Sequence, residues 1–245
     1  MATSIMQVGY IDSFYDLPQL DHSVRFPWRA YYPAQKAGMQ APIMTGKFPL
    51  ILALNLTNTS SQALAAAGNI VCQLQFPNRT AVTPTDYPQW LTTHQPLVAA
   101  NKQAVKQSLL VVERLLAPRQ INSAHLQAHI LLTQVGACGQ GFGGSVALEL
   151  LRRSHLITAA SATTNFLASQ KWNSPCAKPQ LLLQTVAAAG LTPIFKRARK
   201  RAYLYTSPQP LSAETQAQLN ADFFATSFAQ RRFSPPAKVN WLCKS

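Results

Sequence analysis

The sequence predicts a single α/β domain with a mostly parallel central sheet and helices on both faces. A chain of 245 residues is long enough for one large domain of this class. Its hydrophobic content of 47% is that of an ordinary globular protein. Short apolar runs also alternate with longer segments of helical spacing, which indicates strands separated by helices. We expect the domain to span residues 1–233 and residues 234–245 to form an extended tail.

Apolar spacing predicts the elements along the chain. The run FPLILAL at residues 48–54 is continuously apolar, which is typical of a central strand buried on both faces. Apolar residues recur at helical spacing over residues 98–116, and Pro118 ends that helix. Ser212 is the expected N-cap of the last helix. The expected strands lie at residues 28–32, 48–54, 69–74, 157–162, 180–186 and 202–205, with one more that ends at Ala137. The expected helices lie at residues 60–67, 98–116, 143–153 and 212–228.

Basic residues greatly outnumber acidic ones. The chain has 22 Lys and Arg against 8 Asp and Glu, a net charge of +14. From residue 151 onward, 13 basic residues face only Glu214 and Asp222, which leaves a local net of +11. Such an excess favours an anionic partner, either RNA or anionic lipid, although a dense basic run can also be a solvated loop. The densest run, KRARKR, contains the candidate anion-binding residues Lys196, Arg197, Arg199, Lys200 and Arg201.

Cysteine and histidine patterns indicate neither disulfides nor a metal site. The four cysteines are widely spaced and form no CxxC pair, which suits a reducing compartment. The first residues lack the pattern of a signal peptide, and no apolar run is long enough to span a membrane. We therefore expect a cytoplasmic or organelle-interior protein that is not secreted. His125 and His129 lie four residues apart without a third ligand, so we expect no metal and no cofactor.

The stretch VGACGQGFGG at residues 135–144 has the form of a strand, a tight turn and a helix. Glycines allow the strand and helix of such a motif to pass closely. Three further segments precede it: RAYYPA at 29–34, KFPLILALNLTN at 47–58 and LAAAGNIVCQLQFPN at 64–78. In this order, the four segments resemble the α/β-hydrolase superfamily, in the branch that contains platelet-activating-factor acetylhydrolases, dienelactone-hydrolase-like enzymes and polyester hydrolases.

The resemblance places the catalytic positions of that family on residues of other types. The nucleophile position is Gly141, flanked by Gly139, Gln140, Phe142 and Gly143, and the His-Gly oxyanion loop is replaced by Asn55 and Leu56. A glycine at the nucleophile position keeps the turn, which requires a positive φ, and lacks the hydroxyl.

The other two triad members also lack counterparts. The only histidine after the turn is His155, immediately after the elbow helix, and no acidic residue lies between Glu149 and Glu214. Cys138 and Ser145 are expected to be packing residues. The sequence therefore predicts a vestigial elbow and a chain that is not an enzyme.

These observations together favour a catalytically inactive homologue that acts as a binding or accessory subunit. Its expected partners are proteins and an anionic surface of RNA or lipid. One alternative is a ligand-binding protein that keeps an apolar acyl pocket. Another is an esterase-like or lipase-like hydrolase whose catalytic residues have been relocated.

Overall fold

A computed structural model describes residues 6–17, 24–117, 124–186, 190–236 and 241–244. Its centre is a ten-stranded sheet in the order β10-β9-β8-β7-β6-β4-β5-β2-β1-β3. The six strands from β9 to β5 in this order run parallel, while β2 pairs with β5 and β10 pairs with β9 in antiparallel fashion. This architecture confirms the predicted fold class: a single α/β domain with a mostly parallel sheet.

The elements have the following bounds. The strands are β1 (Gln7–Leu17), β2 (Val24–Ala34), β3 (Gly38–Met39), β4 (Phe48–Leu54), β5 (Ile70–Leu74), β6 (Ile130–Gln140), β7 (Ala159–Thr163), β8 (Gln180–Thr185), β9 (Ala202–Ser207) and β10 (Trp241–Lys244). The helices are α1 (Asn58–Ala66), α2 (Tyr87–Thr93), α3 (Gln95–Leu116), α4 (Ala124–Gln127), α5 (Phe142–Arg153), α6 (Thr192–Arg197) and α7 (Ala213–Phe228).

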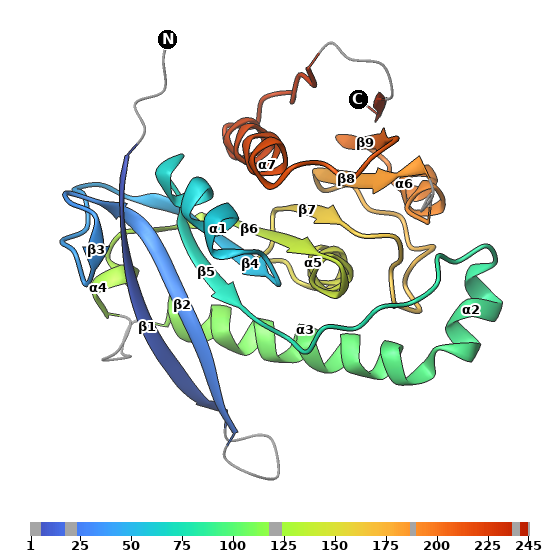
Figure 1. Cartoon of the computed structure of the whole chain (residues 1–245), viewed down its shortest axis with the longest axis horizontal. Helices are drawn as coiled ribbons and strands as arrows, with labels where there is room; N and C mark the ends of the chain where they lie inside the picture. Colours follow the sequence, from blue (N-terminus) through green and yellow to red (C-terminus); the bar gives the residue numbers. More distant parts are fainter. Residues whose placement is uncertain (1–5, 18–23, 118–123, 187–189, 237–240, 245) are drawn as a thin grey trace.

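Helices cover both faces of the parallel sheet (Figure 1). The helices α3 and α5 pack against each other on one face, and α1 and α7 pack together on the other. The side chains of β4 alternate between these two layers. Leu50, Leu52 and Leu54 belong to the apolar cluster that includes α3 and α5, while Ile51 and Ala53 belong to the cluster that includes α1 and α7. This is why the β4 sequence is apolar at every position.

Strands β1 and β10 lie outside the predicted elements, whereas β2 lengthens the strand predicted at residues 28–32. The long hairpin of β1 and β2 extends one side of the sheet, and Arg29 on β2 forms a bidentate ion pair with Asp12 on β1. At the other side, Trp241–Lys244 of the expected tail pairs with β9 as the edge strand β10. Among the described residues, no helix is both long and apolar enough to cross a membrane.

Candidate functional site

The turn between β6 and α5 has the geometry of a nucleophile elbow. Gly141 has φ +56° and ψ −123°, a backbone conformation that residues other than glycine adopt only with strain. Its N–H donates to the Thr163 carbonyl oxygen over 2.8 Å, which ties the turn to the end of β7. Its own carbonyl oxygen accepts from the N–H groups of Gly144 and Ser145 and begins α5. The chain therefore reverses from strand to helix within one residue.

Glycines on both sides of the turn allow a very close approach of backbone to backbone. A Cβ at Gly139 would lie 2.1 Å from the Gly143 carbonyl oxygen. A Cβ at Gly143 would lie 2.1 Å from the carbonyl oxygen of Leu54, at the end of β4. A Cβ at Gly141, in contrast, would meet no atom within 4 Å, so the space above the turn is open. Close backbone contacts at Gly139 and Gly143 therefore fix the shape of the elbow, whereas Gly141 at its apex faces open space.

Asn55 and Leu56 lie beside the elbow but hold the sheet together. Asn55 has φ +55°, and its side-chain oxygen accepts from the Phe76 N–H over 2.7 Å. Leu56 is buried, and its carbonyl oxygen accepts from the side-chain amides of Gln73 and Gln75, each over 2.8 Å. Both residues of the expected oxyanion loop are therefore bonded toward β5 and the segment after it.

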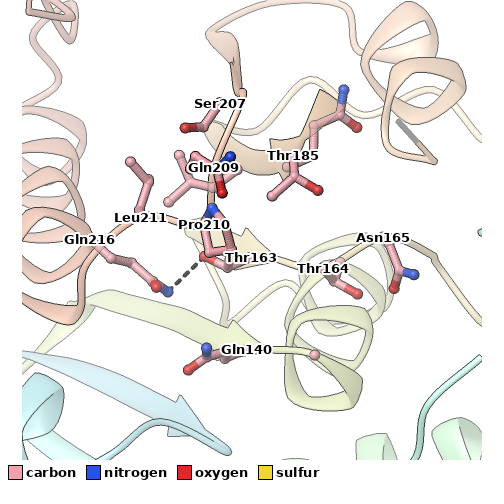
Figure 2. Close-up of a pocket in the computed structure, with 13 residues that line it drawn as sticks. Gln140, Thr163, Thr164, Asn165, Thr185, Ser207, Gln209, Pro210, Leu211 and Gln216 are labelled. Carbon is pink, nitrogen blue, oxygen red and sulfur yellow. Dashed lines mark hydrogen bonds between the residues drawn. The ribbon is translucent and has the colours of Figure 1, made fainter. Parts of the chain in front are cut away.

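A pocket of about 270 Å³ opens beside Gly141. It lies at the carboxyl ends of β6, β7, β8 and β9, the edge where parallel α/β sheets bind ligands. Figure 2 shows the side chains around it, with the Gln216 amide reaching from α7 to Thr163. The lining residues are Gln140, Gly141, Thr163, Thr164, Asn165, Leu183, Gln184, Thr185, Ser207, Gln209, Pro210, Leu211 and Gln216.

Some polar side chains of the pocket are held by the protein itself. The Gln216 amide donates to the Thr163 hydroxyl over 2.6 Å. The Gln184 amide donates to two threonine hydroxyls, and its oxygen accepts from the Leu191 N–H. These bonds fix the two glutamines in place.

Other polar groups of the pocket remain available. Within the described residues, no hydrogen bond occupies the side chains of Gln140, Thr185, Ser207 or Gln209. These side chains supply both donors and acceptors. None of the 13 described residues that line the pocket is Asp, Glu, His, Cys, Lys or Arg. The pocket can therefore form hydrogen bonds with a ligand but offers it no charged partner.

The other candidate residues are buried or unrelated to the pocket. Burial raises the pKa of the Cys138 thiol to about 12, so this thiol stays protonated at neutral pH. The hydroxyl of Ser145 is buried, donates to Asn101 and accepts from the Ala168 N–H. His129 contacts the Gly46 carbonyl oxygen, whereas the His125 side chain lies outside the described residues. The described residues contain no cluster of three metal-binding side chains.

The basic run lies at the opposite end of the sheet from the pocket. Lys196 and Arg197 form the last turn of α6, and Arg199 to Arg201 lead into β9. The run therefore precedes a strand, whereas the pocket follows the strand ends. The structure does not bring the five basic residues near the elbow.

The sheet, its flanking helices and the elbow together form an α/β-hydrolase fold. The chain is similar to a ferulic acid esterase from Streptomyces cinnamoneus, with a TM-score of 0.70. The similarity covers 97% of this chain and 95% of that one, at 14% sequence identity. No protein-family model and no curated protein sequence matches the chain. At this level of identity, the likeness shows the fold and does not identify a branch of the superfamily.

The likeness contradicts the prediction that the chain is not an enzyme. A solved structure that shares its fold over nearly the whole of both chains is an esterase, so this fold is compatible with catalysis. That prediction rested on the residue types at positions assigned by resemblance, and the fold offers other polar side chains near the elbow. We therefore withdraw the expectation of catalytic inactivity.

The sequence predictions did not include most polar residues of the pocket, although the positions of these residues at strand ends indicate that they lie together. Six polar residues of the lining lie at the last positions of buried strands or directly after them: Thr163, Thr164, Asn165, Gln184, Thr185 and Ser207. Polar residues that follow apolar runs in a parallel sheet gather at one edge. These side chains are neutral and, apart from Ser207, do not belong to the Ser, Asp and His types of a hydrolase triad.

Proposed function

We propose that this α/β-hydrolase-fold protein binds a small, uncharged, polyhydroxylated ligand of monosaccharide size in the pocket beside Gly141. One observation carries the proposal: the lining supplies amide and hydroxyl groups without an ionisable side chain. A charged ligand buried there would lose its hydration without gaining an opposite charge, which is costly. A neutral ligand with donors and acceptors avoids that cost.

Size and wall chemistry support the same class of ligand. The volume of about 270 Å³ lies just below the common range for ligand pockets, which begins at roughly 300 Å³. Carbon atoms form most of the exposed wall, from threonine methyls, glutamine methylenes, Pro210 and Leu211. A sugar ring presents C–H faces to such walls and hydroxyl groups to the polar tips. This lining favours a hydroxylated ligand over an apolar acyl chain, which was the ligand of one alternative hypothesis from the sequence.

Calorimetric titration with three related sugars tests the proposal. D-glucose, D-glucuronate and D-glucosamine share one ring and differ in the charge of one substituent. We expect D-glucose to bind at least about 10-fold more tightly than either charged analogue, because the pocket lacks a counter-charge. Equal or tighter binding of a charged analogue would contradict the proposed ligand class. The same titration with an acetylated sugar reports whether a bound ester is cleaved.

A matched pair of variants on α7 locates the binding. Gln216→Leu removes an amide from the pocket wall, and Gln218→Leu makes the same change at an exposed position two residues later. The Gln216 side-chain oxygen accepts no hydrogen bond within the described residues, so it is the atom open to a ligand, and its loss should weaken D-glucose about 5- to 30-fold. The Gln218 variant should bind as the parent does. Equal losses in both variants would place the ligand elsewhere.

A further inference from the structure

The basic residues of the C-terminal half gather at the amino ends of β7, β8 and β9. Arg152 and Arg153 end α5 before β7, Lys178 precedes β8, and the KRARKR run precedes β9. Helix α7 starts beside the pocket and runs back to the same edge, where Phe233 packs on Tyr203 with ring centroids 5.1 Å apart. Arg231 and Arg232 precede Phe233 directly. The positive charge is therefore concentrated at the end opposite the neutral pocket.

Some of these cations bind the protein itself. The Lys178 ammonium donates to the carbonyl oxygens of Leu151, Ser154 and Ile157 at the end of α5. The Lys244 ammonium donates to the carbonyl oxygens of Lys196 and Ala198, over 2.9 and 3.0 Å, and thereby caps α6. Arg153 pairs with Glu149. These side chains are occupied and stabilise helix ends.

Seven other cations are exposed, and no ion pair within the described residues involves them. We call these seven the basic face: Lys196, Arg197, Arg199, Lys200, Arg201, Arg231 and Arg232. Five of the seven are arginines, whose planar guanidinium groups bind phosphate through two parallel hydrogen bonds. The basic face therefore suits phosphate groups better than a diffuse negative charge.

The protein backbone holds the central part of the basic face in a fixed position. Ala198 pairs with Cys176 in a β-bridge, and the Arg199 N–H donates to the Cys176 carbonyl oxygen over 2.8 Å. The Arg201 carbonyl oxygen accepts from the Gln180 N–H over 3.0 Å. Arg201 also has φ +50°, a conformation that glycine or asparagine adopts more readily than arginine. The backbone at Arg201 is therefore held by its neighbours in a conformation that is unfavourable for arginine.

We propose that the basic face binds the phosphate backbone of double-stranded nucleic acid, independently of the pocket. Phe195 and Phe233, next to these cations in the sequence, are buried, as is Tyr203, while Trp241 is partly buried with its ring packed on Tyr205 and Phe233. They cannot stack on exposed bases, which disfavours recognition of single strands. Leu242 on β10 is exposed beside this face, but a single leucine buries too little apolar area to anchor a protein in a membrane, which disfavours lipid binding. Contact with backbone phosphates of a duplex uses the exposed cations alone.

Fluorescence anisotropy with a labelled RNA duplex and a DNA duplex of the same sequence tests this proposal. If seven phosphates are contacted, the slope of log affinity against log salt should be about −6 for the parent. The test variant has Gln at five positions of the basic face: Lys196, Arg197, Arg199, Lys200 and Arg201. Its slope should be shallower by about 4, and its binding should be at least about 30-fold weaker at about 0.1 M salt. Comparison of the two duplexes identifies which nucleic acid supplies the phosphates.

A control variant separates the basic face from net charge. It replaces five exposed cations elsewhere with Gln, at Lys36, Lys47, Arg79, Lys102 and Lys106. This variant loses the same charge and should bind within about 3-fold of the parent. If the five-fold variant fails to fold, as seen by circular dichroism, the double variant Arg231→Gln with Arg232→Gln replaces it, with an expected slope change of about 2. Equal losses in test and control, absence of duplex binding, or tighter binding to phosphatidylserine vesicles would each overturn the proposal.

Discussion

Gly143→Ala is expected to prevent stable folding, because the new methyl group would lie 2.1 Å from the Leu54 carbonyl oxygen. That atom belongs to the backbone of the central strand β4, so it cannot move aside as a flexible side chain can. Helix α5 would have to separate from the sheet. Overpacking of this kind should cost at least about 4 kcal/mol, a large share of the 5–15 kcal/mol that stabilises a typical domain. Thermal unfolding followed by circular dichroism measures the effect.

Gly141→Ala is the matched control, since the same methyl group there meets no atom within 4 Å. Its cost comes only from the positive φ of +56° and should be about 1–3 kcal/mol. This variant should remain folded with a lowered melting temperature. If Gly143→Ala melts within a few degrees of the parent, the close contact between α5 and β4 is wrong.

Glu149→Gln should have the second largest effect, because this carboxylate compensates buried positive charge. Glu149 is 1% exposed, accepts from the Ser169 hydroxyl and pairs with Arg153. The adjacent Arg152 has two buried side-chain nitrogens, Nε and Nη2, without a hydrogen-bond partner among the described residues. Burial is also the main reason why the pKa of Arg152 is lowered, and the charge of Glu149 opposes that shift. Neutralising Glu149 leaves the Arg152 guanidinium uncompensated.

The expected loss for Glu149→Gln is about 3 kcal/mol, the usual cost of breaking a buried ion pair. Arg153→Gln should cost less, about 1 kcal/mol, because the buried Glu149 carboxylate keeps the hydrogen bond from Ser169 and the charge of Arg152, and the Arg153 side chain itself is 36% exposed. Adding Arg152→Leu to Glu149→Gln should recover part of the loss, since the unpaired buried charge is then gone. Urea denaturation of the parent, these three variants and the single variant Arg152→Leu gives the free energies of unfolding. A strictly additive double variant would show that Arg152 and Glu149 are not coupled.

The sequence predicted the central sheet because its strands are apolar on both faces. The bounds of β4 agree with the predicted 48–54, and the strand at 69–74 differs from β5 by one residue. The hairpin strand β1 was missed, since its sequence QVGYIDSFYDL mixes polar and aromatic residues and contains no continuous apolar run. Helix α6 was missed because its six residues are too few for a helical period.

The candidate site could be predicted only in part. The elbow glycines have a local sequence pattern, so their position followed from residues 135–144. The pocket is assembled from residues of four strand ends and α7 that lie far apart in the chain, such as Gln140 and Gln216. Neither residue has a local signature, because their shared edge is created by strand order and by the return of α7. Such long-range assembly is visible only in the folded chain.

The central claim is that a small hydroxylated ligand occupies the pocket beside Gly141, and threonine methyl NMR tests it most directly. Thr163, Thr164 and Thr185 line the pocket, whereas Thr92 and Thr93 lie on α2 and outside the pocket lining. With threonine methyl groups labelled, saturating D-glucose should shift the resonances of the three pocket threonines and leave those of Thr92 and Thr93 unchanged. Shifts confined to threonines outside the pocket, or none at any concentration, would contradict the account.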